Sequence, residues 1–537
     1  MLPCVIFEDE HLLVVNKPAG MNTHAPSPFA GEGVYDWLRH REPRWANLAI
    51  IHRLDKETSG VIVFGKTALA NRSLTEQFTE RAVRKKYLLL SDCAPKQSPL
   101  VAKSKISRAG ERYVSGARGE EAETRFRALD SKFKIQNSKL IMVEPLTGRT
   151  HQIRVHAAEN GFPILGDVLY GGTPFHRVCL HAAELGLRHP SSDEKMIFEA
   201  PVDFEKDARE ALRTALNDFK ETNAFRIIHG ASDGWPGWYV DRFEDFLLSQ
   251  SEAKLLQEQR RHLDARPGKR GVYHKILSRH VRGASAAGAS PQLISGEAAP
   301  ERLVVCENGV QFELSFNEGY SVGLFLDQRD NRRRFLAGHV AAGFPLFKED
   351  GDRLPIGSGQ VSACPTVLNV FAYTCGFSVC AAKGGARTTS VDLSKKYLEW
   401  GRRNFTLNGL DPAAHDFIYG DAFDWLRRLA KKARTFDVIV LDPPTFSQSK
   451  ERGVFRAETH YGELVAAALA LLRTEGVLFA STNAADWAPE KFLGAIEKSV
   501  RAAKRKIVQQ HYAPQPPDFP ISRAEPAYLK TVWMRIT

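Results

Sequence analysis

The sequence has 537 residues and a net charge of +11, with 43% hydrophobic and 26% charged residues, which are the proportions of a folded protein and exclude a disordered chain. At about 150 residues per domain the length predicts three or four domains, and the positive charge admits a polyanionic partner such as RNA without establishing one. The sequence has no run of 18 apolar residues, no signal-peptide pattern and seven scattered cysteines without C-x-x-C spacing, so we expect a cytoplasmic protein with reduced thiols, no membrane span and no metal.

The first part of the chain, residues 1–204, contains many short runs of strand-forming residues. They lie at 12–15 (LLVV), 61–64 (VIVF), 85–90 (KKYLLL) and 139–143 (KLIMV), with few long helical patterns between them. This pattern predicts an α+β domain with a mixed, largely antiparallel sheet. Residues 205–222 are polar helix formers, so we expect a linker helix within 205–224.

The pattern of residue types changes at Phe225. Residues 225–335 predict a small α+β domain that binds RNA or substrate, and the small, polar residues 282–300 predict a flexible surface loop. Strand and helix patterns then alternate from Thr366 onward. This alternation predicts a doubly wound, Rossmann-like α/β domain, which we place at 336–537.

The motif HRLDKETSG at residues 52–60 contains a carboxylate, Asp55, in a polar stretch. Alone, such a residue is most often a loop residue or a helix cap. Further motifs change this interpretation: HLLVVNKPAG (11–20), RKKY (84–87), LTGRTHQIRVH (146–156), PILGDVLYG (163–171) and LHAAELGLRHP (180–190). Together and in this order they resemble the RluA-type pseudouridine synthases over residues 1–204, without the S4-type accessory module that some relatives carry ahead of the catalytic domain.

This resemblance implies isomerisation of uridine in RNA, with Asp55, Tyr87 and Arg154 as catalytic residues. A carboxylate beside the sugar carbon can stabilise its positive charge, attack it or take a sugar proton, and the sequence leaves these three roles open. Arg154 would keep Asp55 ionised, and Tyr87 would stack on the base or remove its carbon-5 proton. Arg53 would fill the space that the flipped base leaves, and Arg149 and His151 are more readily phosphate-binding or structural than chemical. No cofactor is expected for this reaction.

A second site is predicted where the strand LNVFAY runs into a loop and a helix, because doubly wound sheets bind adenosine ligands beyond the carboxyl ends of their strands. Asp392 lies 23 residues after Asn369, a spacing suited to ribose hydroxyls, and Asp421 would lie near an adenine. The stretch LDPPTFSQSK (441–450) places Asp442, Pro443 and Pro444 at the end of a strand, where they would hold a planar base. A dehydrogenase is the alternative for such a fold, but the D-P-P-x-F element and the lack of G-x-G-x-x-G argue against it.

Residues 225–537 resemble the RlmI/RlmK-type rRNA methyltransferases of the large subunit. The resemblance rests on DGWPGWYVDRF (233–243), GLFLDQRDNRRR (323–334), GGARTTSVDLSKKYLEW (384–400), NFTLNGL (404–410) and the motifs of the second site. It implies S-adenosylmethionine as cofactor, Asp442 as a catalytic residue, and Arg329 and Arg332 as RNA-binding residues, with a solvated basic helix start as the alternative for the two arginines. The expected cofactor contacts are Asn369, Phe371, Tyr373, Thr374, Gly376, Asp392, Asp421, Asp442, Pro443 and Pro444.

The absence of a cysteine after the strand GVLFAST bears on which base atom is methylated. Methylation of cytosine at carbon-5 needs a thiolate that attacks the ring, and relatives that do this carry a cysteine after the strand GVLFAST. Here residues 480–483 read Ala-Ser-Thr-Asn. A ring nitrogen needs no covalent help, so we favour guanine N7 over cytosine C5.

The sequence therefore predicts a bifunctional RNA-modifying enzyme that acts on RNA, in the first place 23S rRNA or a large-subunit assembly intermediate. Two alternatives stay open: an RNA-binding ribosome-assembly factor with one or both sites inactive, and a synthase domain that acts on tRNA. The target nucleotides and the oligomeric state do not follow from the sequence.

Overall fold

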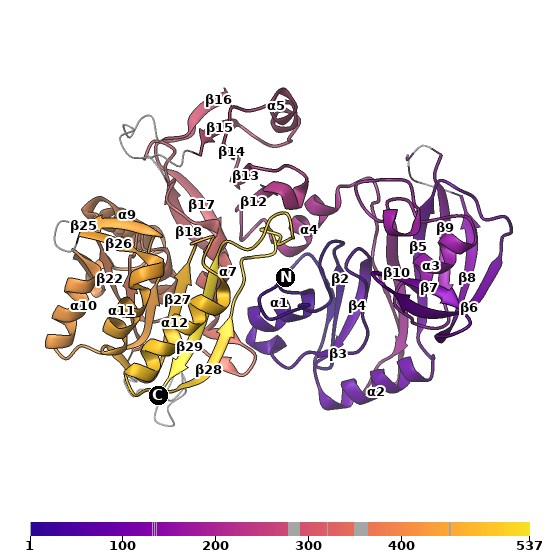
Figure 1. Ribbon diagram of the computed structural model, residues 1–537, viewed down its shortest axis with the longest axis horizontal. Helices are drawn as coiled ribbons and strands as arrows, with labels where there is room; N and C mark the ends of the chain where they lie inside the picture. Colours follow the sequence, from indigo (N-terminus) through magenta and orange to yellow (C-terminus); the bar gives the residue numbers. More distant parts are fainter. Residues whose placement is uncertain are drawn as a thin grey trace. The chain divides into compact units, whose positions relative to one another are not determined.

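A computed structural model describes residues 2–130, 133, 135, 137–277, 290–318, 321–347, 364–449 and 453–537. The chain divides into two compact units (Figure 1). The first comprises residues 1–26, 32–39 and 47–218, and the second comprises residues 27–31, 40–46 and 219–537. No helix among the described residues is long and apolar enough to cross a membrane.

The first unit is built on an eleven-stranded sheet with the order β1-β2-β4-β10-β5-β9-β8-β6-β7, in which β3 pairs with β4 and β11 with β10. All neighbouring strands are antiparallel except β4 and β10. The strands are β1 (Val5–Glu8), β2 (Leu12–Lys17), β3 (Ala49–Ile50), β4 (Ser59–Gly65), β5 (Arg84–Ser91), β6 (Leu100–Ala109), β7 (Arg112–Gly116), β8 (Glu120–Leu129), β9 (Lys139–Pro145), β10 (Leu180–Arg188) and β11 (Lys195–Glu199). The helices of this part of the chain are α1 (Val34–Arg41), α2 (Ala68–Thr79), α3 (Gln152–Glu159) and α4 (Ala208–Leu216), with the 3-10 turns η1 (Pro43–Trp45) and η2 (Val168–Tyr170).

The strand pattern of the sequence explains this sheet. Strands β6 and β8, near the β7 end of the sheet, alternate buried and exposed residues, as half-buried antiparallel strands do, whereas β4 is buried along its whole length. Helix α2 begins after Thr67, whose side chain accepts a hydrogen bond from Ala70 N. The α+β fold class with a largely antiparallel sheet is confirmed.

The second unit starts with a five-stranded sheet, β12-β13-β14-β15-β16, and helix α5 (Gln257–Asp264). Its strands are β12 (Ala224–His229), β13 (Trp238–Phe243), β14 (Phe246–Ser251), β15 (Gly271–Ile276) and β16 (Gln292–Gly296). The loop predicted at 282–300 is wrong at residues 292–296, because β16 pairs there with β15, from Gly271↔Gly296 to His274↔Gln292. Cross-strand pairing outweighs the turn-like composition of this segment. Residues 282–289 lie outside the described residues.

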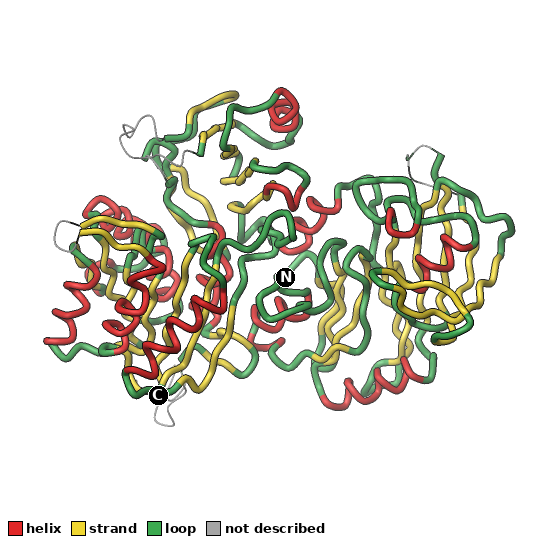
Figure 2. The backbone as a smooth tube through the Cα atoms, in the orientation of Figure 1, coloured by secondary structure: helices red, strands yellow, loops and turns green. Residues whose placement is uncertain are grey.

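A seven-stranded sheet follows, with the order β23-β22-β21-β24-β27-β29-β28, and helices flank it (Figure 2). Its strands from β23 to β27 are parallel and the last two pairings are antiparallel. The order of elements is β17 (Leu303–Glu307), β18 (Val310–Leu314), η4 (Leu326–Gln328), α7 (Arg329–Ala337), β19 (His339–Ala341), β20 (Phe344–Pro345), β21 (Thr366–Val370), α8 (Gly376–Lys383), β22 (Arg387–Asp392), α9 (Lys395–Leu407), β23 (Asp416–Tyr419), α10 (Ala422–Lys431), β24 (Phe436–Leu441), β25 (Phe446–Ser449), β26 (Gly453–Arg456), α11 (Ala457–Leu469), β27 (Leu472–Thr482), α12 (Pro489–Ala502), β28 (Ile507–Tyr512) and β29 (Lys530–Ile536).

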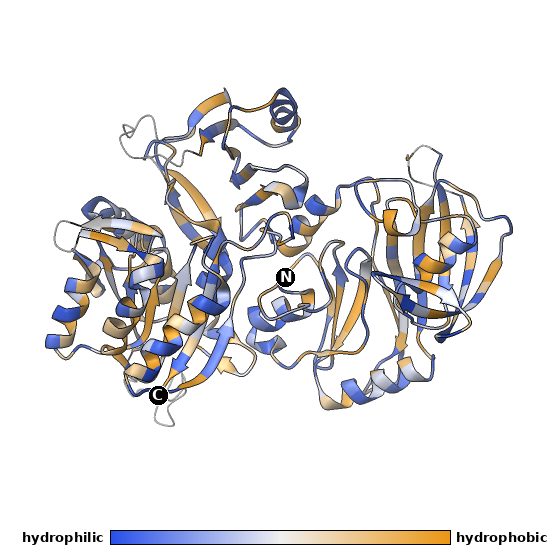
Figure 3. Cartoon of the chain, in the orientation of Figure 1, coloured by the Kyte–Doolittle hydropathy of each residue, from blue (hydrophilic) through white to orange (hydrophobic). Residues whose placement is uncertain are grey.

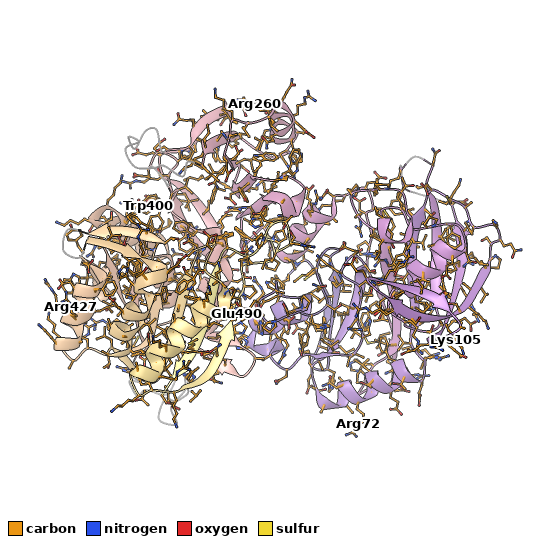
Figure 4. All side chains as sticks on the ribbon, viewed as in Figure 1. Arg72, Lys105, Arg260, Trp400, Arg427 and Glu490 are labelled. Carbon is orange, nitrogen blue, oxygen red and sulfur yellow. The ribbon has the colours of Figure 1, made fainter. Side chains whose placement is uncertain are left out.

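Helices cover both faces of the parallel sheet, and its central strand β24 is largely apolar on both faces (Figure 3). Along β24, Val438 and Val440 belong to one core together with residues of α8 and α9, while Ile439 and Leu441 belong to a second core with residues of α10, α11 and α12. The outer side chains of the helices reach solvent, as Arg427 of α10 does (Figure 4). The Rossmann-like α/β class of this part of the chain is confirmed.

Candidate functional sites

Asp55 lies in the loop between β3 and β4, and the chain around Gly20 fixes this loop. Thr23 Oγ1 donates to Leu54 O at 2.9 Å and accepts from Leu54 N at 3.1 Å. The fully buried Lys17 Nζ donates to Lys56 O at 3.2 Å and to two carbonyls of its own turn, and burial lowers the pKa of Lys17 to about 7. Lys17 of the motif HLLVVNKPAG thus holds the Asp55 loop through the carbonyl of Lys56.

The Asp55 carboxylate faces a pocket of about 490 Å³. The pocket is lined by Arg53, Leu54, Asp55, Thr58, Lys85, Tyr87, Pro145, Thr147, Gly148, Arg149, His151, Gln152, Ile153, Arg154 and Leu180. All six residues predicted for the first site are therefore brought together, from the β3–β4 loop, from β5 and from the start of α3. Asp55 Oδ2 lies 4.0 Å from Arg154 Nη1 and 3.9 Å from His151 Nε2.

The main partner of Arg154 is a carboxylate that the sequence analysis did not assign. Arg154 Nε and Nη2 donate to Asp167 Oδ2 and Oδ1, both at 2.7 Å, and Asp167 is 1% exposed. Burial alone would favour the neutral guanidine, but the hydrogen bonds and the charge of Asp167 raise the pKa of Arg154. The signal was present in PILGDVLYG, which contains Asp167 and also Tyr170, whose ring lies 5.0 Å below the guanidinium.

Tyr87 lies on β5 and its phenol is partly buried. Burial, together with the negative charge of Asp55, raises the pKa of Tyr87 well above its usual value. The phenol is therefore neutral in the pocket, which suits a ring that stacks on a base and opposes use of the phenolate as a base.

The three RNA-binding residues predicted for the first site differ in their surroundings. Arg53 is exposed at the mouth of the pocket. Arg149 is held by Glu120 and by the carbonyl of Glu121, so its charge is largely compensated. His151 is more enclosed and makes hydrogen bonds to Tyr170 and Arg154.

The second site begins in the loop after β21, whose backbone is unusual. Phe371, Tyr373 and Cys375 all have positive φ, at 62°, 50° and 63°. Non-glycine residues rarely adopt this conformation, and such strain is concentrated at functional sites. Asp392 at the end of β22 holds the loop, since its Oδ2 accepts from Tyr373 N at 2.8 Å and its Oδ1 from Ser394 N at 2.8 Å.

A cavity of about 270 Å³ lies beside this loop. It is lined by Phe371, Leu393, Asp421, Ala422, Phe423, Ser447, Gly453 and Phe455. Flat rings on its walls and a carboxylate at its rim fit the adenosine part of S-adenosylmethionine. Asp421 Oδ1 accepts from Phe423 N and Asp424 N, so it also caps α10. Of the predicted contacts, Phe371 and Asp421 line this cavity. Leu393 and Phe423 were not predicted although they follow Asp392 and Asp421 closely in sequence, and Phe455 comes from β26, a segment without a predicted contact.

Two predicted cofactor contacts need correction. Asn369 and Thr374 are each 1% exposed. Asn369 Nδ2 donates to Ser378 Oγ at 2.9 Å, and Thr374 Oγ1 donates to Gly323 O at 2.6 Å. Their side chains are therefore used inside the protein, where they fix the loop and the start of α8 at Gly376. Neither residue lines the cavity described above.

Asp442 lies at the end of β24 and is partly buried, followed by the buried Pro443 and the exposed Pro444. Its Oδ1 accepts from Gln328 Nε2 at 3.2 Å, and the same amide donates to Ser481 Oγ at 2.8 Å. Burial, together with the charge of Asp327, raises the pKa of Asp442 to about 6. The hydroxyl of Tyr461 ties the ends of β24 and β27 together through Leu441 O and Ser481 O.

Arg329 and Arg332 are buried inside the protein, which does not fit the RNA-binding role predicted for them. They are 4% and 3% exposed. Arg329 binds Asp518 through both terminal nitrogens, and Arg332 donates from Nε and Nη2 to Glu307, both at 2.7 Å. The basic start of α7 is thus an internal ion-pair layer, because buried carboxylates from distant segments meet it.

The chain matches two family models. One is described as RNA pseudouridylate synthase and matches residues 11–159; the other is described as S-adenosylmethionine-dependent methyltransferase and matches residues 356–535. These matches confirm the two families that the sequence motifs indicated.

Two relatives and one solved structure illustrate the similarity. A ribosomal RNA large subunit methyltransferase of Deinococcus radiodurans is 31% identical over 68% of this chain and 84% of its own length. A ribosomal large subunit pseudouridine synthase C of Yersinia pestis is 42% identical over 37% of this chain. The matched region covers 66% of the length of that synthase. The crystal structure of SMU.776 in complex with SAH has a TM-score of 0.50 and 27% identity, over 65% of this chain and 87% of that chain.

Proposed function

From the premise that this chain belongs to the ribosomal RNA large subunit methyltransferase family and also carries an RNA pseudouridylate synthase domain, we propose that it is a bifunctional enzyme of large-subunit rRNA. Residues 1–204 would convert uridine to pseudouridine, 205–224 would link the two parts, 225–335 would bind RNA, and 336–537 would transfer the methyl group. The observation that carries the proposal is the convergence of Asp55, Tyr87 and Arg154 on one pocket, in a chain that has a separate cavity lined by Phe371, Asp421 and Phe455.

In the first reaction Asp55 faces the sugar of a uridine that has left its stack. The bond from the sugar to N1 breaks, the base turns, a bond to carbon-5 forms, and the hydrogen of carbon-5 is lost as a proton while N1 gains one. Arg154 Nη1 lies 4.0 Å from Asp55 Oδ2, so the guanidinium holds a positive charge beside the acid while the sugar reacts. Tyr87 offers a neutral ring for stacking, and Arg53 at the mouth of the pocket can enter the space left by the base.

In the second reaction S-adenosylmethionine supplies a methyl group on a positively charged sulfur. Asp392 and Asp421 would bind the hydroxyls and the adenine, with the rings of Phe371, Phe423 and Phe455 beside them. Asp442 and Pro443–Pro444 would hold the acceptor base at the end of β24. Alignment of the acceptor and exclusion of water account for much of the rate of such a displacement.

We favour guanine N7 over cytosine C5 as the methyl acceptor, because no cysteine stands where the attack on cytosine would need one. The positions after Phe479 that would hold an attacking cysteine are Ala480, Ser481, Thr482 and Asn483, and Ser481 is fully buried. Burial raises the pKa of Cys375 to about 12, so this thiol near the donor loop is not an available thiolate. Transfer to N7 needs no thiolate, because the nitrogen lone pair attacks the methyl carbon directly.

The test is nucleoside analysis of RNA after reaction with the purified full chain. An unmodified transcript of large-subunit rRNA and, separately, a tRNA mixture transcribed in vitro are incubated with and without S-adenosylmethionine, digested and examined by mass spectrometry. We expect pseudouridine in rRNA under both conditions and 7-methylguanosine only with the cofactor. 5-Methylcytidine would overturn the N7 assignment, pseudouridine only in tRNA would overturn the rRNA substrate, and no modified nucleoside would favour an assembly factor.

Two substitutions separate the reactions. Asp55→Ala removes pseudouridine and leaves methylation, and Asp442→Ala does the reverse. Matched controls are Asp193→Asn in the first unit and Glu497→Gln in the second, which remove solvent-exposed carboxylates that pair with Arg188 and Arg501. Both controls are expected to retain both products.

A further inference from the structure

His151 lies in the synthase pocket, yet the proposed reaction gives it no role. It precedes α3 with φ 57° and ψ 15°, a left-handed conformation that costs energy for a residue with a side chain. Its ring stands between Tyr113 and Tyr170, with centroids at 5.3 and 5.6 Å, and its Nε2 points to the Arg154 guanidinium. A strained backbone that aims an imidazole into a pocket requires an explanation.

The hydrogen bonds of Arg154 show what His151 contributes. Nε and Nη2 of Arg154 are occupied by the buried Asp167, so Nη1 is the nitrogen nearest to Asp55, at 4.0 Å. His151 Nε2 lies 3.1 Å from this same Nη1. A guanidinium nitrogen can only donate, so the imidazole nitrogen must accept and carries no proton.

The opposite nitrogen fixes the tautomer. His151 Nδ1 lies 2.8 Å from the hydroxyl oxygen of Tyr170, which also accepts from Tyr113 N at 2.9 Å. Since Nε2 is the acceptor for Arg154, a neutral ring carries its proton on Nδ1 and donates it to Tyr170. The chain of bonds therefore runs from β7 through Tyr170 and His151 to the one nitrogen of Arg154 that faces Asp55.

We propose that neutral His151 is a positioning residue of the synthase site, which holds Arg154 Nη1 toward Asp55 while Tyr170 fixes the imidazole tautomer. This rests on the proposed synthase function. Protonation of Nε2 would end the bond to Arg154 and place a second cation against the guanidinium, so the arrangement would be lost in acid.

The surroundings of His151 favour its neutral form. Burial and the neighbouring Arg154 guanidinium lower the pKa of His151, against the opposite influence of the two nearby carboxylates. The titratable or charged groups that face it are Asp55 from the β3–β4 loop, Arg154 from α3, Asp167 and Tyr170 from η2, and Tyr113 from β7. The imidazole therefore protonates at lower pH than a histidine in water does.

The experiment compares His151→Asn with His151→Gln in the full chain. Asparagine tolerates the left-handed backbone but is too short to reach Arg154, whereas the glutamine amide oxygen can take the place of Nε2. Release of the carbon-5 hydrogen as tritium from a [5-³H]uridine-labelled large-subunit rRNA transcript reports pseudouridine formation. Single-turnover rates are measured against RNA concentration and pH, with methyl transfer by the same preparation as the folding control.

We expect His151→Asn to lower the saturating rate about 10- to 100-fold with little change in the RNA concentration for half-saturation, as for loss of a hydrogen bond to a charged group. His151→Gln should lose less, and the acid limb of its profile should lie at lower pH than in the unsubstituted protein, because the group that titrates has been removed. Tyr170→Phe, which deletes the acceptor of Nδ1, should also lower the saturating rate.

An unchanged rate and pH profile in His151→Asn would overturn the inference, as would a loss confined to RNA affinity, which would make His151 a phosphate contact. Loss of methyl transfer together with pseudouridine formation would indicate general unfolding and also reject the specific role. If the unsubstituted protein forms no pseudouridine in rRNA or tRNA, the proposed function itself fails, and this outcome is distinct from the others.

Discussion

Arg154 in the first unit and Arg332 in the second form the same ion pair in different surroundings. Each donates from Nε and Nη2 to a carboxylate that is 1% exposed, Asp167 or Glu307, with all four distances at 2.7 Å. Arg332 also donates to Phe325 O and lies over the rings of Phe312 and Phe377. Arg154 instead turns Nη1 into a pocket that contains Asp55. The pair itself is structural in both units, and Arg154 differs in that its third nitrogen, Nη1, faces Asp55.

The largest effect on activity is expected at Asp55, the carboxylate that Arg154 faces and Arg332 does not. Asp55→Asn keeps the shape of the side chain but removes the charge, and should lower pseudouridine formation on the order of a thousandfold or more. Methyl transfer should remain within twofold of the unsubstituted protein, measured on the same RNA. An equal loss of both activities would contradict the separation of the two sites.

The pairs themselves are compared by Asp167→Asn and Glu307→Gln. Each leaves a buried guanidinium without its counter-charge, and should lower the free energy of unfolding of its own unit by about 3–5 kcal/mol. Only Asp167→Asn should also lower the pseudouridine rate under conditions where the protein stays folded, because Arg154 loses its orientation. Denaturant unfolding and tritium release measure the two effects, and a pseudouridine defect in Glu307→Gln would break the comparison.

Asp442 offers the opposite case, a carboxylate for which no ion pair is found among the described residues. Asp442→Asn should lower methyl transfer on the order of a hundredfold, while the free energy of unfolding at pH 8 should not fall, because burial disfavours the charged form. The pKa in the folded chain, about 6, lies above the ordinary value of 3.8, so the folded state binds the proton more tightly. Stability from this group is therefore present at low pH and lost as pH rises toward 6.

The activity of this site should follow the opposite trend if ionised Asp442 is required. Methyl transfer then declines as pH falls through about 6, and the Asn variant shows no such step. Profiles between pH 5 and 8 in one buffer series measure it. A profile that is flat in the unsubstituted protein would show that the charge of Asp442 is not used.

The smallest effect is expected at the exposed rim of the first pocket. Arg53→Ala should weaken binding of the rRNA transcript less than about tenfold and reduce the slope of log affinity against log salt by about one. Arg332→Lys serves as the comparison, because its buried cation makes no RNA contact and should leave the slope unchanged. An altered slope for Arg332→Lys would restore the interpretation of α7 as an RNA surface.

Much of the fold follows from local sequence pattern. Short runs of strand-forming residues predicted the sheet of the first unit, and the alternation of strand and helix patterns from Thr366 onward predicted the parallel strands of the second, among them FDVIVL. β16 was missed because its composition resembles a loop, and only pairing with β15 makes it a strand. Among the site residues, Asp55, Tyr87 and Arg154 were accessible through their motifs. Their assigned roles, like the domain boundaries, stay predictions.

The sequence by itself determined the two families, the α+β and α/β fold classes and the set of motif residues, because these depend on periodicity and spacing along the chain. Only the tertiary structure decided which charged groups meet. Asp167 reaches Arg154 from 13 residues away, whereas Glu307 and Asp518 reach α7 from 25 and 189 residues away. The cost of burying a charge depends on its partners in space, so an arginine that reads as an RNA contact in sequence can become an internal support once a buried carboxylate lies beside it.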